Sequence, residues 1–114
     1  MKLSELIREG IKVIQRNGHH KGSYVPSDCE DPSAAPCCGF GAIHIAASGD
    51  WNRNGCEWRT IHYGADSYKA WEALDEDCSR LYDSNFWEWQ DGVSQTEVLR
   101  RMGATARRLE KAGV

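Results

Sequence analysis

The chain has 114 residues, of which 40% are hydrophobic and 27% are charged, and its formal net charge is −3. These values are typical of one soluble globular domain, and an acidic balance argues against a dedicated DNA-binding protein. No stretch approaches the roughly 20 apolar residues that a membrane-spanning helix needs, so we do not expect a membrane protein.

The first predicted element is an amphipathic helix over residues 3–17. Ser4 is a suitable N-cap, and Gly18 is a suitable end. Gly10 costs about 1 kcal/mol relative to alanine inside a helix, which indicates that another element packs closely against it. The apolar residues fall largely on one face at helical spacing, and they are Leu3, Leu6, Ile7, Ile11, Val13 and Ile14.

This segment is also charged where a secretory signal peptide would be apolar. We therefore expect a cytoplasmic protein, in which cysteines stay reduced. The cysteines are five in number, which excludes a fully paired disulfide framework. Cys37 and Cys38 are adjacent and poorly placed to bridge each other.

Residues 18–36 contain repeated glycine and proline and are predicted to form an extended loop. A short helix is predicted to follow over residues 36–49, because proline suits a first helical turn and glycine suits the end of a helix. Its internal glycines are costly unless another backbone lies against them. We therefore interpret Cys37 and Cys38 as small hydrophobic residues that pack in a tight contact between helices.

Residues 50–64 are the least regular part of the sequence. The pair Asn54-Gly55 favours a tight turn, so this segment is predicted to be an irregular insert or a β-hairpin.

A clear helix is predicted over residues 66–82, where Trp71, Leu74, Cys78 and Leu81 recur at spacings of three and four. Cys78 therefore belongs to the core. In the segment that follows, aromatic residues are interspersed with polar ones, which predicts a short extended segment or a turn over residues 86–89.

The strongest local signal is a capping box before the last helix. Ser94 is the predicted N-cap and Glu97 the third helical residue, while Val93 and Val98 form the accompanying hydrophobic staple. The helix is predicted to end at Gly113. The sequence as a whole predicts a mainly α, compact single domain over residues 1–114, with about four helices and the insert near residues 50–64.

Three segments carry a family resemblance. They are "LIREGIKVIQRNG", the Cys-x-x-Gly-Ala helix "CGFGAIHIAA" from Cys38, and "WQDGVSQTEVLRRM". Together they resemble a family of small uncharacterised proteins of actinobacteria and their phages, although residues 50–64 look inserted. The resemblance implies a compact helical fold and a phage or actinobacterial source, and it implies no activity.

A cysteine-dependent enzyme is one alternative function. The dipole at a helix N-terminus favours a thiolate, so Cys37 or Cys38 would be the nucleophile. The base would be His44, His62 or the His19-His20 pair. The segment matches no hydrolase signature, however, and His44 lies about two turns along the same helix. We therefore expect no catalytic residue.

A zinc-stabilised regulator is a second alternative. Zinc ligands usually come as short pairs such as Cys-x-x-Cys, and this sequence has no such pair. We therefore expect no metal and no cofactor. The ligands that could be assembled at irregular spacing are Cys29, Cys37 or Cys38, Cys56 and His62, with His19 or His20 as a substitute.

A nucleic-acid-binding regulator is the third. Residues 94–114 carry a net charge of +3, which leaves −6 for the rest of the chain. Phosphate contacts would fall to four residues that share a helix face: Arg100, Arg107, Arg108 and Lys111. We expect instead a solvated face, because cations near a helix C-terminus complement the helix dipole.

The preferred function is protein binding. Four tryptophans occur in poorly regular segments flanked by charge, namely Trp51, Trp58, Trp87 and Trp89. Interface hot spots are enriched in tryptophan. We predict a non-enzymatic, phage-type protein that binds and modulates a host macromolecule, with a host protein as the expected partner.

Overall fold

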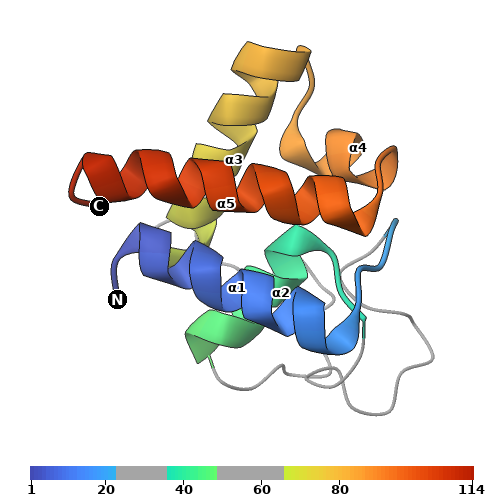
Figure 1. Cartoon of the computed structure of the whole chain (residues 1–114), viewed down its shortest axis with the longest axis horizontal. Coiled ribbons are helices and arrows are strands. Elements are labelled where there is room, and N and C mark those ends of the chain that lie inside the picture. The colour runs from blue at the N-terminus through green and yellow to red at the C-terminus, as the bar shows by residue number, and fades with distance from the viewer. Residues whose placement is uncertain (23–35, 49–65) are drawn as a thin grey trace.

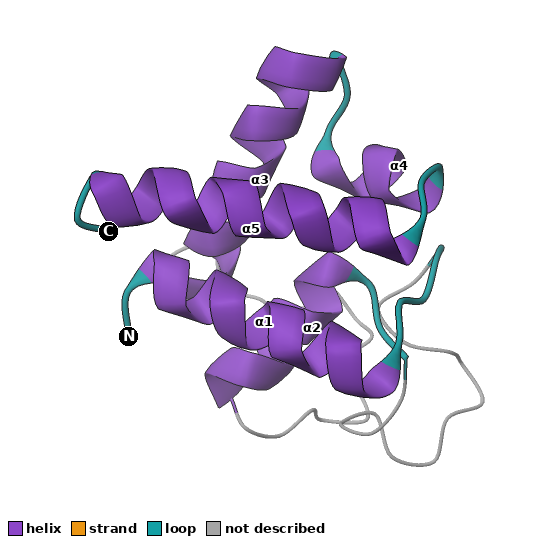
Figure 2. Ribbon diagram, viewed as in Figure 1, coloured by secondary structure: helices purple, strands orange, loops and turns teal. Residues whose placement is uncertain are grey.

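The computed structural model describes residues 1–22, 36–48 and 66–114. Within these ranges the secondary structure is helical, as Figure 2 shows, and the predicted mainly α class is confirmed. The predicted insert at residues 50–64 lies outside the described residues. The helices are α1 (Leu3–Asn17), α2 (Gly39–Ser48), α3 (Asp66–Tyr82), α4 (Phe86–Asp91) and α5 (Gln95–Lys111). None of them is both long and apolar enough to cross a lipid bilayer.

Helices α1 and α5 lie side by side and antiparallel, so that both chain ends meet at the same side of the molecule (Figure 1). The amide and the hydroxyl of Ser4 both donate to the Val114 carbonyl oxygen, each at 3.1 Å. The prediction of Ser4 as N-cap was therefore wrong, because Lys2 occupies that position and the Ser4 hydroxyl serves the C-terminus instead. Further along, Arg8 binds both carboxylate oxygens of Glu110, at 2.9 and 2.7 Å.

Two glycines let helices approach closely. A Cβ added at Gly10 would lie 2.9 Å from Ile43 Cγ1 and 3.3 Å from the Ile43 backbone nitrogen, which confirms that α2 packs tightly on α1 at this point. A Cβ at Gly39 would lie 2.6 Å from Cε1 of the buried Phe86 ring. Both approaches are shorter than ordinary van der Waals contact, so glycine is required by packing rather than by backbone conformation.

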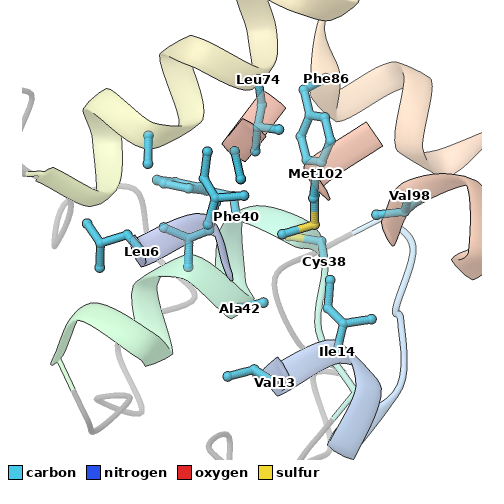
Figure 3. Close-up of a cluster of buried hydrophobic side chains, with 14 of the residues drawn as sticks. Leu6, Val13, Ile14, Cys38, Phe40, Ala42, Leu74, Phe86, Val98 and Met102 are labelled. Carbon is cyan, nitrogen blue, oxygen red and sulfur yellow. The ribbon is translucent and has the colours of Figure 1, made fainter. Parts of the chain in front are cut away.

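The hydrophobic core collects side chains from all five helices (Figure 3). Phe40, Phe86 and Leu74 are completely buried in it, as is Met102. The Phe40 ring stacks on Trp71, with centroids 4.4 Å apart and planes 19° apart. Cys78 is also buried, as predicted.

Helix α4 corrects the prediction of an extended segment or a turn over residues 86–89. Asn85 is its N-cap and accepts from the Glu88 amide at 2.8 Å. The Phe86 amide donates to Asp75 Oδ1 on α3, at 2.6 Å. Phe86 and Gln90 are both buried, four residues apart. The helical period was missed because one of its two inward positions holds a polar residue.

A buried carboxylate joins α3 to α5. Asp77 is 1% exposed and accepts from the Thr105 hydroxyl at 2.7 Å. Arg108 Nε lies 2.9 Å from Asp77 Oδ1, and Arg101 lies 3.7 Å from Oδ2. Burial by itself raises the pKa of Asp77, but these hydrogen bonds and positive charges together lower it below its ordinary value.

The last helix begins as predicted. Ser94 is the N-cap, and its hydroxyl accepts from the Glu97 amide at 3.2 Å. The reciprocal bond of the predicted capping box, from the Ser94 amide to Glu97, is not found among the described residues, and the Glu97 carboxylate instead binds Arg100 at 2.7 Å. Gly113 follows the helix with φ +79°, a conformation that favours glycine.

Candidate functional site

The two adjacent cysteines lie in the core, just before α2. The predicted helix start at Pro36 was wrong, because Cys37 instead forms a parallel β-bridge with His19 and the helix begins at Gly39. Cys38 takes the capping role: its Sγ accepts from the Gly41 amide at 3.3 Å, and its carbonyl accepts from the Ala42 amide at 2.9 Å.

Burial removes the nucleophilic form of both thiols. Cys37 and Cys38 are 0% and 1% exposed, and desolvation raises the pKa of each to about 12. The thiolate is the nucleophile of cysteine chemistry, so a thiol with such a pKa is almost entirely protonated near neutral pH. The helix N-terminus does not compensate for the loss of hydration.

The imidazole of His19, beside Cys37 in the β-bridge, is engaged with a glutamine of α4. His19 is half-buried, and its Nε2 lies 3.3 Å from Gln90 Oε1, which also accepts from the Gly39 amide at 2.8 Å. Burial lowers the pKa of His19 and also that of His44. His62 lies outside the described residues.

Only some of the possible zinc ligands lie in the described part of the chain. Cys29, Cys56 and His62 lie outside the described residues. Within the ranges that are described, no three or more His, Cys, Asp or Glu side chains are grouped so that they could hold a metal ion.

The basic face of α5 is partly occupied by carboxylates. Arg108 binds the buried Asp77, and Arg100 binds Glu97 on its own helix. Arg107 and Lys111 are exposed. Phosphate contact by these four residues therefore stays an alternative that the structure does not test, and two of the four are engaged in ion pairs.

Two of the four predicted protein-binding tryptophans lie on α4. Trp87 and Trp89 are half-buried and pack against the core. Trp89 also stacks on Tyr82, with centroids 4.9 Å apart and planes 3° apart. Trp51 and Trp58 lie outside the described residues.

Trp87 lines a surface pocket between α3 and α4. The pocket has a volume of about 270 Å³, and its walls are Trp71, Asp75, Asn85, Trp87 and Glu88. The helical spacing placed Trp71 on the apolar side of the predicted helix, and no sequence pattern singled out Asp75. Their spacing of four residues on one helix places both on the same side, and this was the signal that could have identified them.

The pocket carries two carboxylates whose charges are not neutralised by any lysine or arginine of the described part of the chain. Asp75 uses Oδ1 to accept from the Phe86 amide. The Glu88 side chain is exposed at the start of α4. Because Asn85 takes the Glu88 amide, the first turn of α4 is already capped, and both carboxylates retain acceptor capacity. The pocket therefore combines indole walls with negative charge.

A larger hollow of about 560 Å³ lies between α3, α5 and Leu3. Its walls carry charges of both signs, including Lys69, Glu72, Glu76 and Arg108, and they contain no aromatic ring. Hot-spot residues are mostly tryptophan, tyrosine and arginine in desolvated pockets. The smaller pocket is accordingly the stronger candidate for binding a partner.

Comparison with known proteins places the chain in a family. The sequence profile described as "Family of unknown function (DUF6197)" matches residues 1–108, which is nearly the whole chain. No curated protein and no solved structure matches it. The expected resemblance to an uncharacterised small-protein family is confirmed, whereas the actinobacterial or phage source stays a prediction. The chain belongs to the DUF6197 family of unknown function.

Proposed function

We propose that this protein is a non-enzymatic interaction module that binds another protein through the α3–α4 face. The observation that carries the proposal is the pocket between Trp71 and Trp87, which we call the indole pocket, with its two carboxylates. Tryptophan and tyrosine contribute large contact areas at interfaces, because each ring buries much surface and has few rotamers to lose.

The rings of this face are held in place before any partner binds. Trp71 stacks on the buried Phe40, and it forms a T-shaped pair with Tyr68 at a centroid distance of 5.8 Å. Trp87 and Trp89 pack against the core. Rigid side chains lose little conformational freedom on association, which favours binding.

The state of the thiols supports a binding role over a cysteine-dependent enzyme. Cys37 and Cys38 are buried with a pKa of about 12, and the Cys38 sulfur is occupied in capping α2. A nucleophilic cysteine instead needs access and a lowered pKa.

The proposal extends to a partner and a setting. The partner is a host protein and the setting the host cytoplasm, if the chain is phage-encoded as its sequence resemblance implies. Binding would then modulate the host protein by occupying one of its surfaces, since no chemical step is required of the chain.

Quantitative affinity capture tests this proposal. The purified chain is used as bait in a lysate of the host organism, beside Trp87→Ala and the control Leu81→Ala. Leu81 is an exposed apolar residue of α3 outside the indole pocket. We expect at least one host protein to be retained by the parent chain and by Leu81→Ala, and to be lost with Trp87→Ala. Retention that is equal for all three baits, or absent for all, would contradict the proposal.

A further inference from the structure

We infer that the indole pocket receives an arginine side chain of the partner protein. This inference rests on the proposed function and specifies which chemical group that function recognises. It follows from the charge of the pocket, the identity of its walls and the geometry of the guanidinium group.

The charge of the pocket selects a cation. Asp75 and Glu88 both line it, and neither forms an ion pair with a basic side chain of the described residues. On α3, the nearby Arg80 points its guanidinium to Asp77, at 3.4 Å. Two carboxylates that have no basic partner in the described part of the chain and lie beside an apolar wall attract a positive group. They disfavour a carboxylate or phosphate, because like charges repel most strongly where solvent is partly excluded.

The walls of the pocket select the same kind of group. Indole is the ring that attracts cations best, since its π face carries negative charge density. Trp71 and Trp87 supply two such rings on separate helices. The stacking of Trp71 on Phe40 fixes the angle of one of them.

The combination of rings and carboxylates favours arginine over lysine. A guanidinium is planar, so it stacks on an indole while its five N–H donors reach carboxylates in the plane. An ammonium is a strongly hydrated point charge and gains less from stacking. Asp75 keeps Oδ2 for such a contact, because Oδ1 already accepts from the Phe86 amide.

The test is a titration followed by ¹H–¹⁵N correlation spectra of the full chain. The indole N–H signals are assigned with single Trp→Phe variants. The probes are N-acetyl-arginine methylamide and its uncharged isostere N-acetyl-citrulline methylamide. We expect the arginine probe to shift the Trp71 and Trp87 signals saturably, and the citrulline probe to bind at least about fivefold more weakly.

Two variants locate the charges that matter. Glu88→Gln should weaken arginine binding about threefold to tenfold, and Asp75→Asn should act similarly while its side-chain oxygen still accepts from the Phe86 amide. Glu76→Gln removes the same charge from an α3 residue outside the indole pocket and should change affinity less than twofold. Equal binding of both probes, or unchanged affinity in Glu88→Gln, would overturn the inference.

The outcomes of the two experiments are separable. If a host protein depends on Trp87 but is retained equally by Glu88→Gln, protein binding stands and arginine recognition fails. If the arginine probe binds as expected but no host protein depends on Trp87, the proposed function fails while the pocket keeps its chemical preference.

Discussion

Two regions contain the residues that suggested a function: the segment just before α2, with Cys37 and Cys38, and the α3–α4 face. They differ in how far their side chains are exposed to solvent. Just before α2, the thiols of Cys37 and Cys38 are buried with a raised pKa, and the Cys38 sulfur accepts from the Gly41 amide. At the α3–α4 face, indoles and carboxylates line an open pocket. The same kind of sequence signal, a cluster of chemically distinctive side chains, therefore has a structural role in one region and lines a surface pocket in the other.

The difference shows that environment decides what a side chain can do. A thiol at a helix N-terminus would gain from the dipole, yet desolvation outweighs this gain in Cys37 and Cys38. Asp77 and Asp75 lie two residues apart on α3, and they differ in the same way. Asp77 is buried and surrounded by arginines, whereas Asp75 lines a pocket without a positive partner among the described residues.

The largest expected effect comes from Phe40, which connects the two regions. Phe40→Ala removes a fully buried ring from α2 and also removes the ring on which Trp71 stacks. We expect the free energy of unfolding to fall by about 3–5 kcal/mol, as measured by urea denaturation. The Trp71 indole N–H signal should also broaden or shift, because its stacking partner is gone. A loss below about 1 kcal/mol would show that the indole pocket does not depend on the core beneath it.

A smaller loss of unfolding free energy, which depends on pH, is expected for substitution of Asp77 but not of Asp75. Asp77→Asn leaves arginines facing an uncharged group and should cost about 2–3 kcal/mol near pH 7, less than for a fully buried pair because Arg108 reaches solvent. The native pKa of Asp77 lies below its ordinary value of 3.8. Its contribution is therefore complete above about pH 4 and is lost as the pH falls through the lower native pKa.

Denaturation curves at pH 7 and at several pH values below 4 test this prediction. The difference in unfolding free energy between the parent chain and Asp77→Asn should shrink as the pH falls, while Asp75→Asn should show no comparable difference at pH 7. A gap that stays constant down to pH 2 would mean that the loss arises from packing and not from the carboxylate charge.

The smallest expected effect is that the buried thiols of the folded protein react only slowly with an alkylating reagent. In a Cys29→Ser, Cys56→Ser variant, the thiols that remain are Cys37, Cys38 and Cys78, all buried with a pKa of about 12. Alkylation by iodoacetamide should be slow in native buffer, and its rate should rise with pH from 7 to 9 without a plateau. Denaturant should make all three reactive. Fast alkylation at pH 7 of one thiol would restore the enzyme alternative.

The periodicity of the sequence was sufficient for the long helices. Residues 3–17 and 66–82 were predicted with the bounds that α1 and α3 have, and the capping box identified the start of α5. These features are local, because amphipathic spacing and an N-cap depend on residues within one or two turns. The need for close packing at Gly10 was also readable, since glycine is costly in a helix interior.

The formation of α4 and of the indole pocket depends on tertiary contacts, and the sequence alone did not predict either. The first amide of α4 is capped by Asp75, eleven residues earlier on α3, and no local pattern contains that contact. The pocket needs Trp71 and Trp87 from different helices to converge, and the pKa of Cys38 depends on how completely its neighbours exclude water. Local sequence specifies which helices can form, whereas burial and charge at a site arise from the packing of distant segments and are determined only when the whole chain is folded.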